Sequence, residues 1–124
     1  MAGSVMTFTE NKRFASVKQI KVAWTSDDAT GAVSGTTTYP YDGQIIGAIT
    51  VPGTAGVAPT NLYDIAINDE NSVDVALGAL VDRSSTLTQY VAVASMAGVS
   101  ASKITVAITN AGNSKQGTIY LYIR

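Results

Sequence analysis

Hydrophobic and polar residues alternate with a period of two in several short stretches of the chain. Ile20, Val22 and Trp24, for example, are separated by residues of smaller or more polar character. Because successive side chains of a β-strand point to opposite faces, each stretch predicts a strand with one buried face. The stretches with this pattern are residues 19–24, 45–51, 63–68, 73–78, 104–109 and 118–124. The 23 valines and isoleucines, against 5 leucines, also favour strands over helices.

Turn-forming residues separate these stretches. Asp42-Gly43 is a strong short-range turn signal, and Asn68–Asn71 joins two alternating stretches closely enough to predict a hairpin. Other turn-rich segments are 26–31, 52–59 and 110–117. Turns every 8–12 residues predict an all-β fold, an antiparallel β-sandwich of jelly-roll type with eight or nine strands.

The length of 124 residues fits a single domain. We expect residues 14–124 to form the sandwich and residues 1–13 to form an N-terminal arm or an edge strand. Residues 77–88 and 98–102 have no clear pattern and are left open between loop, helical turn and irregular strand. The predicted core consists of Ile20, Val22, Trp24, Ile45, Ile49, Ile65, Ile67, Val73, Val75, Ile104, Val106, Ile108, Ile119, Leu121 and Ile123.

The composition limits the chemistry of the chain. It contains no cysteine and no histidine, which removes thiolate metal sites, cysteine nucleophiles, the commonest general base and the Ser–His–Asp triad. Charged residues make up only 14%, too few for a typical nucleic-acid binder. Residues 1–10 lack the apolar core of a signal peptide, and no stretch approaches the ~20 apolar residues of a membrane span. We therefore expect a protein made in the cytoplasm that is not an enzyme, needs no cofactor and binds neither nucleic acid nor membrane.

The acidic residues offer one candidate metal site. Asp69, Glu70 and Asp74, with Asn68 and Asn71, could hold Ca²⁺ through oxygen atoms. The segment lacks the ligand order and distal glutamate of an EF-hand, so the favoured interpretation is a solvated hairpin tip and no metal.

Charge is distributed unevenly along the chain. Residues 1–26 carry a net charge of +3, residues 27–82 carry −8 and residues 83–124 carry +4. Blocks of this size also arise by chance. The alternative is a dipolar surface, which favours contacts between copies of the chain or with a partner of opposite sign.

The last alternating stretch places two tyrosines on one face. Tyr120 and Tyr122 lie opposite Ile119, Leu121 and Ile123, so they form a contact surface if nothing covers that side of the strand. A half-buried rim position and a sugar-binding aromatic platform are the alternatives.

Four stretches resemble small virion proteins of tailed bacteriophages: Lys18–Asp27 (KQIKVAWTSD), Tyr41–Ile46 (YDGQII), Leu62–Asp69 (LYDIAIND) and Thr109–Ser114 (TNAGNS). The resemblance implies a virion structural protein on the capsid exterior, foremost a capsid decoration (cement) protein that binds the major capsid protein and stabilises the head. It also implies a homo-oligomer, a trimer ahead of a dimer. The alternatives are a tail, neck or head–tail joining protein and, from another class, a carbohydrate- or receptor-binding module.

The sequence also predicts which residues make the contacts. A basic N-terminal segment should orient the molecule on an acidic surface of a second copy or of the shell, while apolar side chains supply the affinity. Its removal is expected to release the protein without unfolding the sandwich. The predicted contact residues are Met6, Phe8, Lys12, Arg13, Phe14, Tyr120 and Tyr122.

Overall fold

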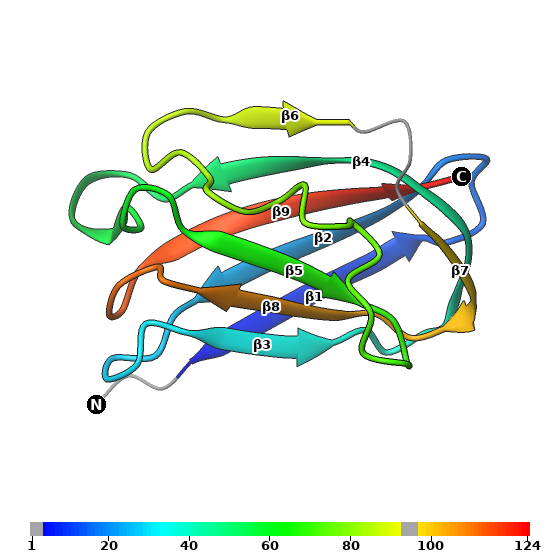
Figure 1. Ribbon diagram of the computed structural model, residues 1–124, viewed down its shortest axis with the longest axis horizontal. Helices are drawn as coiled ribbons and strands as arrows, with labels where there is room; N and C mark the ends of the chain where they lie inside the picture. The colour runs from blue at the N-terminus through cyan, green and yellow to red at the C-terminus, as the bar shows by residue number, and fades with distance from the viewer. Residues whose placement is uncertain (1–3, 93–96) are drawn as a thin grey trace.

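The structure, a computed structural model, describes residues 4–92 and 97–124 and has two layers of antiparallel strands (Figure 1). The strands are β1 (Val5–Lys12), β2 (Lys18–Thr25), β3 (Val33–Thr36), β4 (Tyr41–Pro52), β5 (Asp64–Asn68), β6 (Gln89–Val91), β7 (Gly98–Ser102), β8 (Thr105–Thr109) and β9 (Gln116–Ile123). One 3-10 turn (Ala55–Val57) follows β4. No helix within the described ranges is long and apolar enough to cross a membrane.

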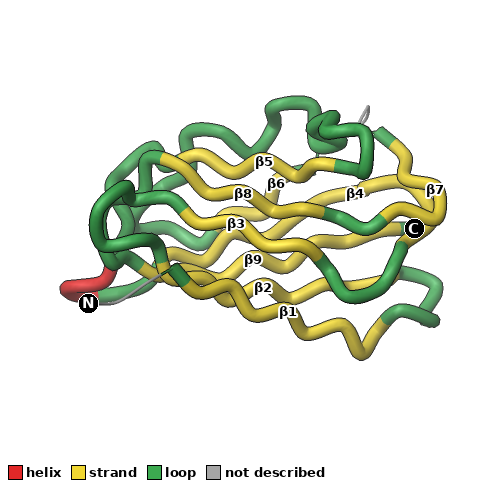
Figure 2. Tube along the Cα trace, turned by 90° about the horizontal axis from the view of Figure 1, so that it is seen from below, coloured by secondary structure: helices red, strands yellow, loops and turns green. Residues whose placement is uncertain are grey.

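The chain passes back and forth between the two layers. The large sheet has the order β1-β2-β9-β4, with β6 and β7 both paired to β4, and the small sheet has the order β3-β8-β5. From β2 onward, successive strands alternate between the sheets, except that β6 and β7 both lie beside β4, and Figure 2 shows the two layers edge-on. This wrapping is the jelly-roll form of the β-sandwich, so the predicted fold class is confirmed.

The core lies between the two sheets and is formed by the inward side of each alternating stretch. All but two of the predicted core residues are buried. The core also contains buried residues that are not among the predicted core residues, namely Val33, Tyr41, Ala48, Tyr63, Ala76, Leu80, Val99 and Ala111.

The first core residue that was predicted wrongly is Ile49, which faces outward. The pairing of β4 with β9 shifts register between Ile45 and Gly47, so one extra residue is accommodated there. Because a shift of one residue exchanges the two faces of a strand, Ala48 and Thr50 point into the core and Ile49 points away from it. The predicted turn at Asp42-Gly43 is also wrong. Both residues lie within β4, where the pairing with β7 is irregular and Gly43 has a positive φ of 129°.

The second exception is Val73, which is 50% exposed because residues 73–78 do not form the predicted strand. Positive φ angles at Ser72, Leu77 and Gly78 interrupt any extended backbone there. Residues 74–83 nevertheless run beside β5, where they form the bonds Val75 N to Ile67 O, Ile65 N to Leu80 O and Arg83 N to Tyr63 O. This irregular segment occupies the position of a fourth strand in the small sheet.

The N-terminal segment forms the edge strand β1, and residues 1–3 of it lie outside the described residues. Met6 and Phe8 pack against the core and approach Gly35 of β3, so closely that a Cβ at position 35 would lie 3.0 Å from the Phe8 ring. These two side chains therefore help to close the open edge between the sheets. Removal of residues 1–13 is expected to destabilise the sandwich, contrary to the expectation from the sequence.

Candidate contact surfaces

The outer face of the large sheet is its most distinctive surface, since the small sheet covers only the inner face (Figure 2). The strand register aligns one outward residue from each of five strands. In this row Thr9 pairs with Lys21, Lys21 with Tyr120, Tyr120 with Ile49, and Ile49 with Tyr90. Residues far apart in the sequence thus form one continuous strip across the sheet.

Tyrosines dominate the middle of this face. The Tyr90 and Tyr122 rings are stacked, with centroids 6.3 Å apart and planes inclined by 27°. Gln19 Nε2 donates a hydrogen bond of 3.3 Å to the Tyr122 hydroxyl, and Lys21 Nζ lies 5.9 Å from the Tyr120 ring centroid. We refer to Gln19, Lys21, Ile49, Tyr90, Tyr120 and Tyr122 as the tyrosine face. Its single charge, on Lys21, leaves it easy to desolvate.

A shallow hollow of about 290 Å³ lies on the same side of the sheet, lined in part by Ala23, Gly53 and Gly117. On the inner side of the sheet, a Cβ at position 117 would lie 2.6 Å from the Trp24 ring, so Gly117 is required for core packing. The outer face therefore carries both the tyrosine rings and this hollow.

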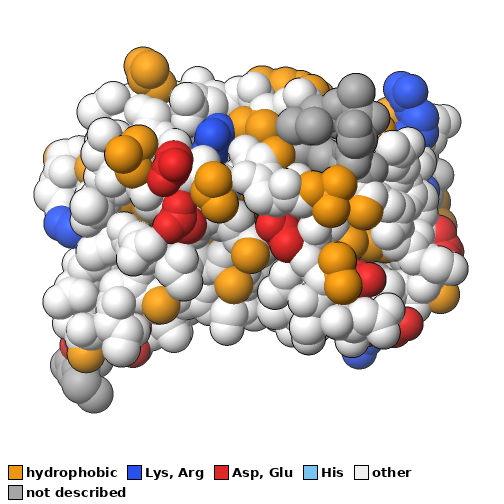
Figure 3. Space-filling view, in the orientation of Figure 1, with side chains coloured by type: hydrophobic (Ala, Val, Ile, Leu, Met, Phe, Trp, Pro, Cys, Tyr) orange, Lys and Arg blue, Asp and Glu red, His pale blue; other side chains and the backbone are white. Residues whose placement is uncertain are grey.

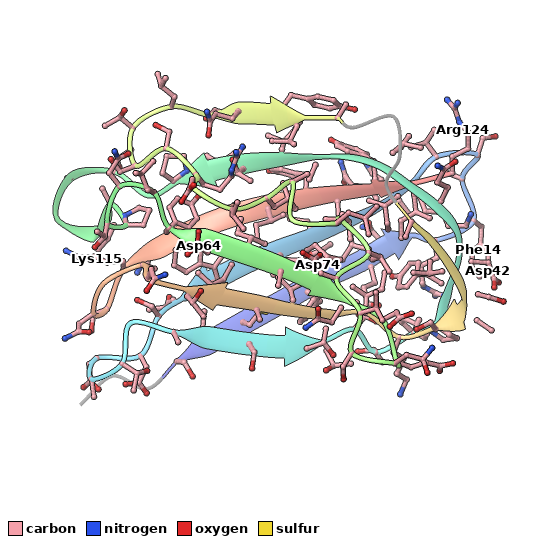
Figure 4. The ribbon with its side chains drawn as sticks, in the orientation of Figure 1. Phe14, Asp42, Asp64, Asp74, Lys115 and Arg124 are labelled. Atoms are coloured by element: carbon pink, nitrogen blue, oxygen red, sulfur yellow. The ribbon has the colours of Figure 1, made fainter. Side chains whose placement is uncertain are left out.

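A second surface lies at the turn between β1 and β2. Phe14 is 89% exposed, and the Arg13 guanidinium carbon lies 4.8 Å from its ring centroid and 3.7 Å from that of Tyr39. Phe14 and Arg124 are found at the same end of the molecule in Figure 4. We refer to Lys12, Arg13, Phe14, Lys18 and Arg124 as the basic tip.

Glu10 anchors the basic tip to the connection between β3 and β4. Its carboxylate accepts hydrogen bonds from Thr38 N (2.9 Å), Tyr39 N (3.2 Å) and the Tyr41 hydroxyl (2.8 Å). Burial of Tyr41, followed by its hydrogen bond to Glu10, raises the pKa of its hydroxyl far above the ordinary value. Tyr41 therefore remains a protonated donor at any physiological pH. The hydrogen bonds of Glu10 thus hold the turn that carries the exposed Phe14 against the connection between β3 and β4.

The predicted contact residues thus separate into two surfaces and an interior pair. Lys12, Arg13 and Phe14 belong to the basic tip, and Tyr120 and Tyr122 belong to the tyrosine face. Met6 and Phe8 were assigned to a contact surface, but their packing against the core turns them inward.

The predicted contact residues did not include four members of the tyrosine face, namely Gln19, Lys21, Ile49 and Tyr90, and the structure explains two of these omissions. Ile49 was missed because the bulge in β4 reverses its direction. Tyr90 was missed because β6 has only three residues, too few for an alternating pattern to be recognised.

Two aspartates on the small-sheet side serve as backbone acceptors. Asp74 Oδ1 accepts from Ile67 N and Ala76 N, and its Oδ2 accepts from Gly78 N, at 3.0–3.1 Å. Asp69 Oδ1 accepts from Asn71 N and Val73 N. Within residues 4–92 and 97–124 no group of three or more acidic side chains is arranged to hold a metal ion.

Asp64 fixes the other end of the irregular segment. It accepts hydrogen bonds from Asp82 N (2.9 Å) and Asn110 Nδ2 (2.6 Å). The bond from Asp82 N, followed by that from Asn110, lowers the pKa of the Asp64 carboxyl below its ordinary value. Asp69 and Asp74, which sequence analysis considered for a metal, therefore act together with Asp64 in shaping the loop.

Comparison of the chain with protein-family models, with curated proteins and with solved structures finds no match.

Proposed function

We propose that this protein is a structural component of a tailed-phage particle, most specifically a decoration protein that binds the major capsid protein through the tyrosine face. The observation that carries the proposal is an uncovered sheet face with three tyrosines and a single charge. Tyrosines are enriched at protein interfaces, and charged residues are depleted at interface centres. The sequence resemblance to small virion proteins supports the choice of a phage shell as the partner.

Repetition on a lattice makes a modest single contact sufficient. Burial of Ile49 and the three tyrosine rings supplies apolar contact area, while the charge of Lys21 sets orientation. Many copies on one shell would then stabilise it by bridging neighbouring capsid subunits.

The test is cosedimentation with heads assembled from the major capsid protein encoded by the same phage genome. Tyr90→Ala combined with Tyr120→Ala is expected to reduce occupancy of the heads at least about tenfold, the effect of losing hot-spot aromatic residues. Leu87→Ala is the matched control, because Leu87 is an exposed apolar residue outside the tyrosine face. Full occupancy by the double tyrosine variant, or no binding by the wild type, would contradict the proposal.

Salt dependence distinguishes the role of the cation from that of the tyrosines. Lys21→Glu is expected to weaken attachment more at low salt than at high salt, because screening shortens the reach of charges. An equal loss at both salt concentrations would show that the Lys21 side chain acts by packing.

A position in the tail, the neck or the head–tail joint is the nearest alternative. Copy number per particle, measured by quantitative mass spectrometry of purified virions, separates the two. Hundreds of copies support decoration of the head, and about a dozen support the neck.

A carbohydrate-binding module is the second candidate function, favoured by one observation. The stacked Tyr90 and Tyr122 rings lie beside the amide of Gln19, and sugar recognition combines aromatic rings with neutral hydrogen-bonding groups. A glycan array decides between these classes: hits lost with Tyr90→Ala would favour the module, and the absence of hits would count against it.

A further inference from the structure

Charged side chains of each sign predominate on different sides of the molecule. Within the described residues, none of the lysines or arginines forms an ion pair with an aspartate or glutamate. Lys12, Lys18 and Lys21 lie on β1 and β2 of the large sheet, whereas Asp64, Asp69 and Asp74 lie on β5 and the segment after it. The separation is partial, because Glu10 and Asp42 lie on strands of the large sheet and Arg83 lies in the segment beside β5.

The small-sheet side exposes apolar side chains among its acids. Leu62 and Leu77 are 53% and 55% exposed, and Val73 and Val81 are also exposed. Figure 3 views the molecule from this side and shows hydrophobic and acidic side chains across it, with a few basic side chains among them. We refer to Leu62, Glu70, Val73, Leu77, Val81 and Asp82 as the acidic layer.

The carboxylates on this side of the molecule differ in what they do inside it. Those of Asp64, Asp69 and Asp74 are occupied by backbone amides. Those of Glu70 and Asp82 accept no hydrogen bond from a described residue. These two are therefore free to pair with cations from outside the molecule.

We propose that the basic tip of one copy docks on the acidic layer of a second copy. The tip offers Phe14 with the Arg13 guanidinium beside its ring, and the layer offers exposed leucine and valine side chains with two free carboxylates. Charge complementarity favours a second copy as the occupant, because one chain presents both surfaces and the tip cations form no ion pair with a described acid. Burial of Phe14 against Leu77 and Val81 supplies the apolar part of the contact.

The contact is head-to-tail, because its two halves are different surfaces of one chain. Such a contact closes into a ring when the rotation between neighbours allows it and otherwise continues as a chain. A ring of three would be the trimer expected from the sequence resemblance. The tyrosine face takes no part in the contact and remains available for the shell, so this inference goes beyond the proposed function.

Two variants separate the halves of the contact. The tip variant carries Lys12→Glu and Phe14→Ser, and the layer variant carries Glu70→Lys and Leu77→Asn. All four residues are exposed, and asparagine tolerates the positive φ of 55° at position 77. The control variant carries Lys115→Glu and Leu87→Ser, which make the same kinds of change elsewhere, with Lys115 at the end opposite Phe14 (Figure 4).

Sedimentation velocity of the full chain at low salt, over a range of concentrations, measures the contact. We expect the wild type and the control to associate and each of the two variants to associate at least about tenfold more weakly. An equimolar mixture of the tip and layer variants should form dimers and stop there, because each pair retains one complete wild-type contact. Circular dichroism checks that every variant is folded.

Three outcomes would overturn the proposal. They are a wild type that stays monomeric at low salt, a mixture that stays monomeric although the wild type associates, and a control variant that loses association like the others. Binding of the tip to an acidic shell instead of a second copy would appear as a monomeric wild type whose attachment to heads still requires Phe14. The experiment needs no phage particle, so its failure is distinct from failure of the proposed function.

Discussion

The two layers of the sandwich are built by different means. In the large sheet, β2, β9 and β4 form long continuous ladders, and β2 and β9 pair over eight consecutive residues. In the small sheet, only β3, β8 and β5 form ladders, and the place beside β5 is filled by residues 74–83, which bond to it through scattered amides and two aspartate side chains. The first layer is held by backbone pairing and the second partly by carboxylates.

This difference explains which side chains each layer exposes. Strand pairing in the large sheet aligns Tyr120, Ile49 and Tyr90 in one row on its outer face. The irregular segment turns its backbone repeatedly, so Leu77 and Val81 point outward while Val75 and Leu80 remain buried. Strand pairing thus orders the side chains of the outer face, and side-chain acceptors allow a loop to stay attached to the core while it exposes apolar groups.

Among the variants considered, removal of the Asp74 carboxylate should lower the free energy of unfolding most. Asp74→Ala leaves three backbone amides without their acceptor, so we expect a loss of about 3 kcal/mol in the free energy of unfolding, measured by urea denaturation. Asp28→Ala is the matched control and should change stability by less than about 0.5 kcal/mol, since Asp28 accepts no hydrogen bond in the described structure. A neutral effect of Asp74→Ala would mean that apolar packing alone holds the segment.

The stability of the large sheet should be sensitive to a methyl group added on its inner face. Gly117→Ala places a methyl group against the Trp24 ring, between two ladders that cannot shift independently, and is expected to cost about 2 kcal/mol. Gly56→Ala is the control, because a Cβ there meets nothing within 4 Å. Thermal unfolding of both variants measures the difference, and equal stabilities would show that the Trp24 ring can move.

Acidification should weaken the small-sheet layer selectively. The lowered pKa of Asp64 means that its hydrogen bonds contribute stability above the pKa of the unfolded chain, and this contribution is lost as the pH falls through the folded value. The sensitive range therefore lies below about pH 4. Hydrogen exchange of the Asp82 amide should increase in that range, and Asp64→Asn should make it less dependent on pH. Unchanged protection of Asp82 at low pH would contradict this role of Asp64.

The smallest effect on stability is expected on the tyrosine face. Tyr90→Ala removes a stacked but largely exposed ring and should lower the free energy of unfolding by less than about 1 kcal/mol. Guanidinium unfolding provides the measurement. A much larger loss would show that the Tyr90–Tyr122 pair stabilises the sheet, and it would count against a role of this pair in docking.

The sequence by itself determined the fold class and most of the core, because β-branched residues with a period of two can bury one face only as strands. Ile20, Val22 and Trp24 needed no tertiary information, and the alternation of the last stretch placed Tyr120 and Tyr122 on the outer face.

Only the tertiary structure decided the remaining features. The bulge in β4 turned Ile49 outward, and the irregular segment beside β5 exposed Val73, since register and loop geometry depend on partners distant in the sequence. Met6 and Phe8 pack against the core because β1 closes an edge that exists only once both sheets have formed. The charges form blocks along the chain, but their partial separation in space was decided by which strands share a sheet.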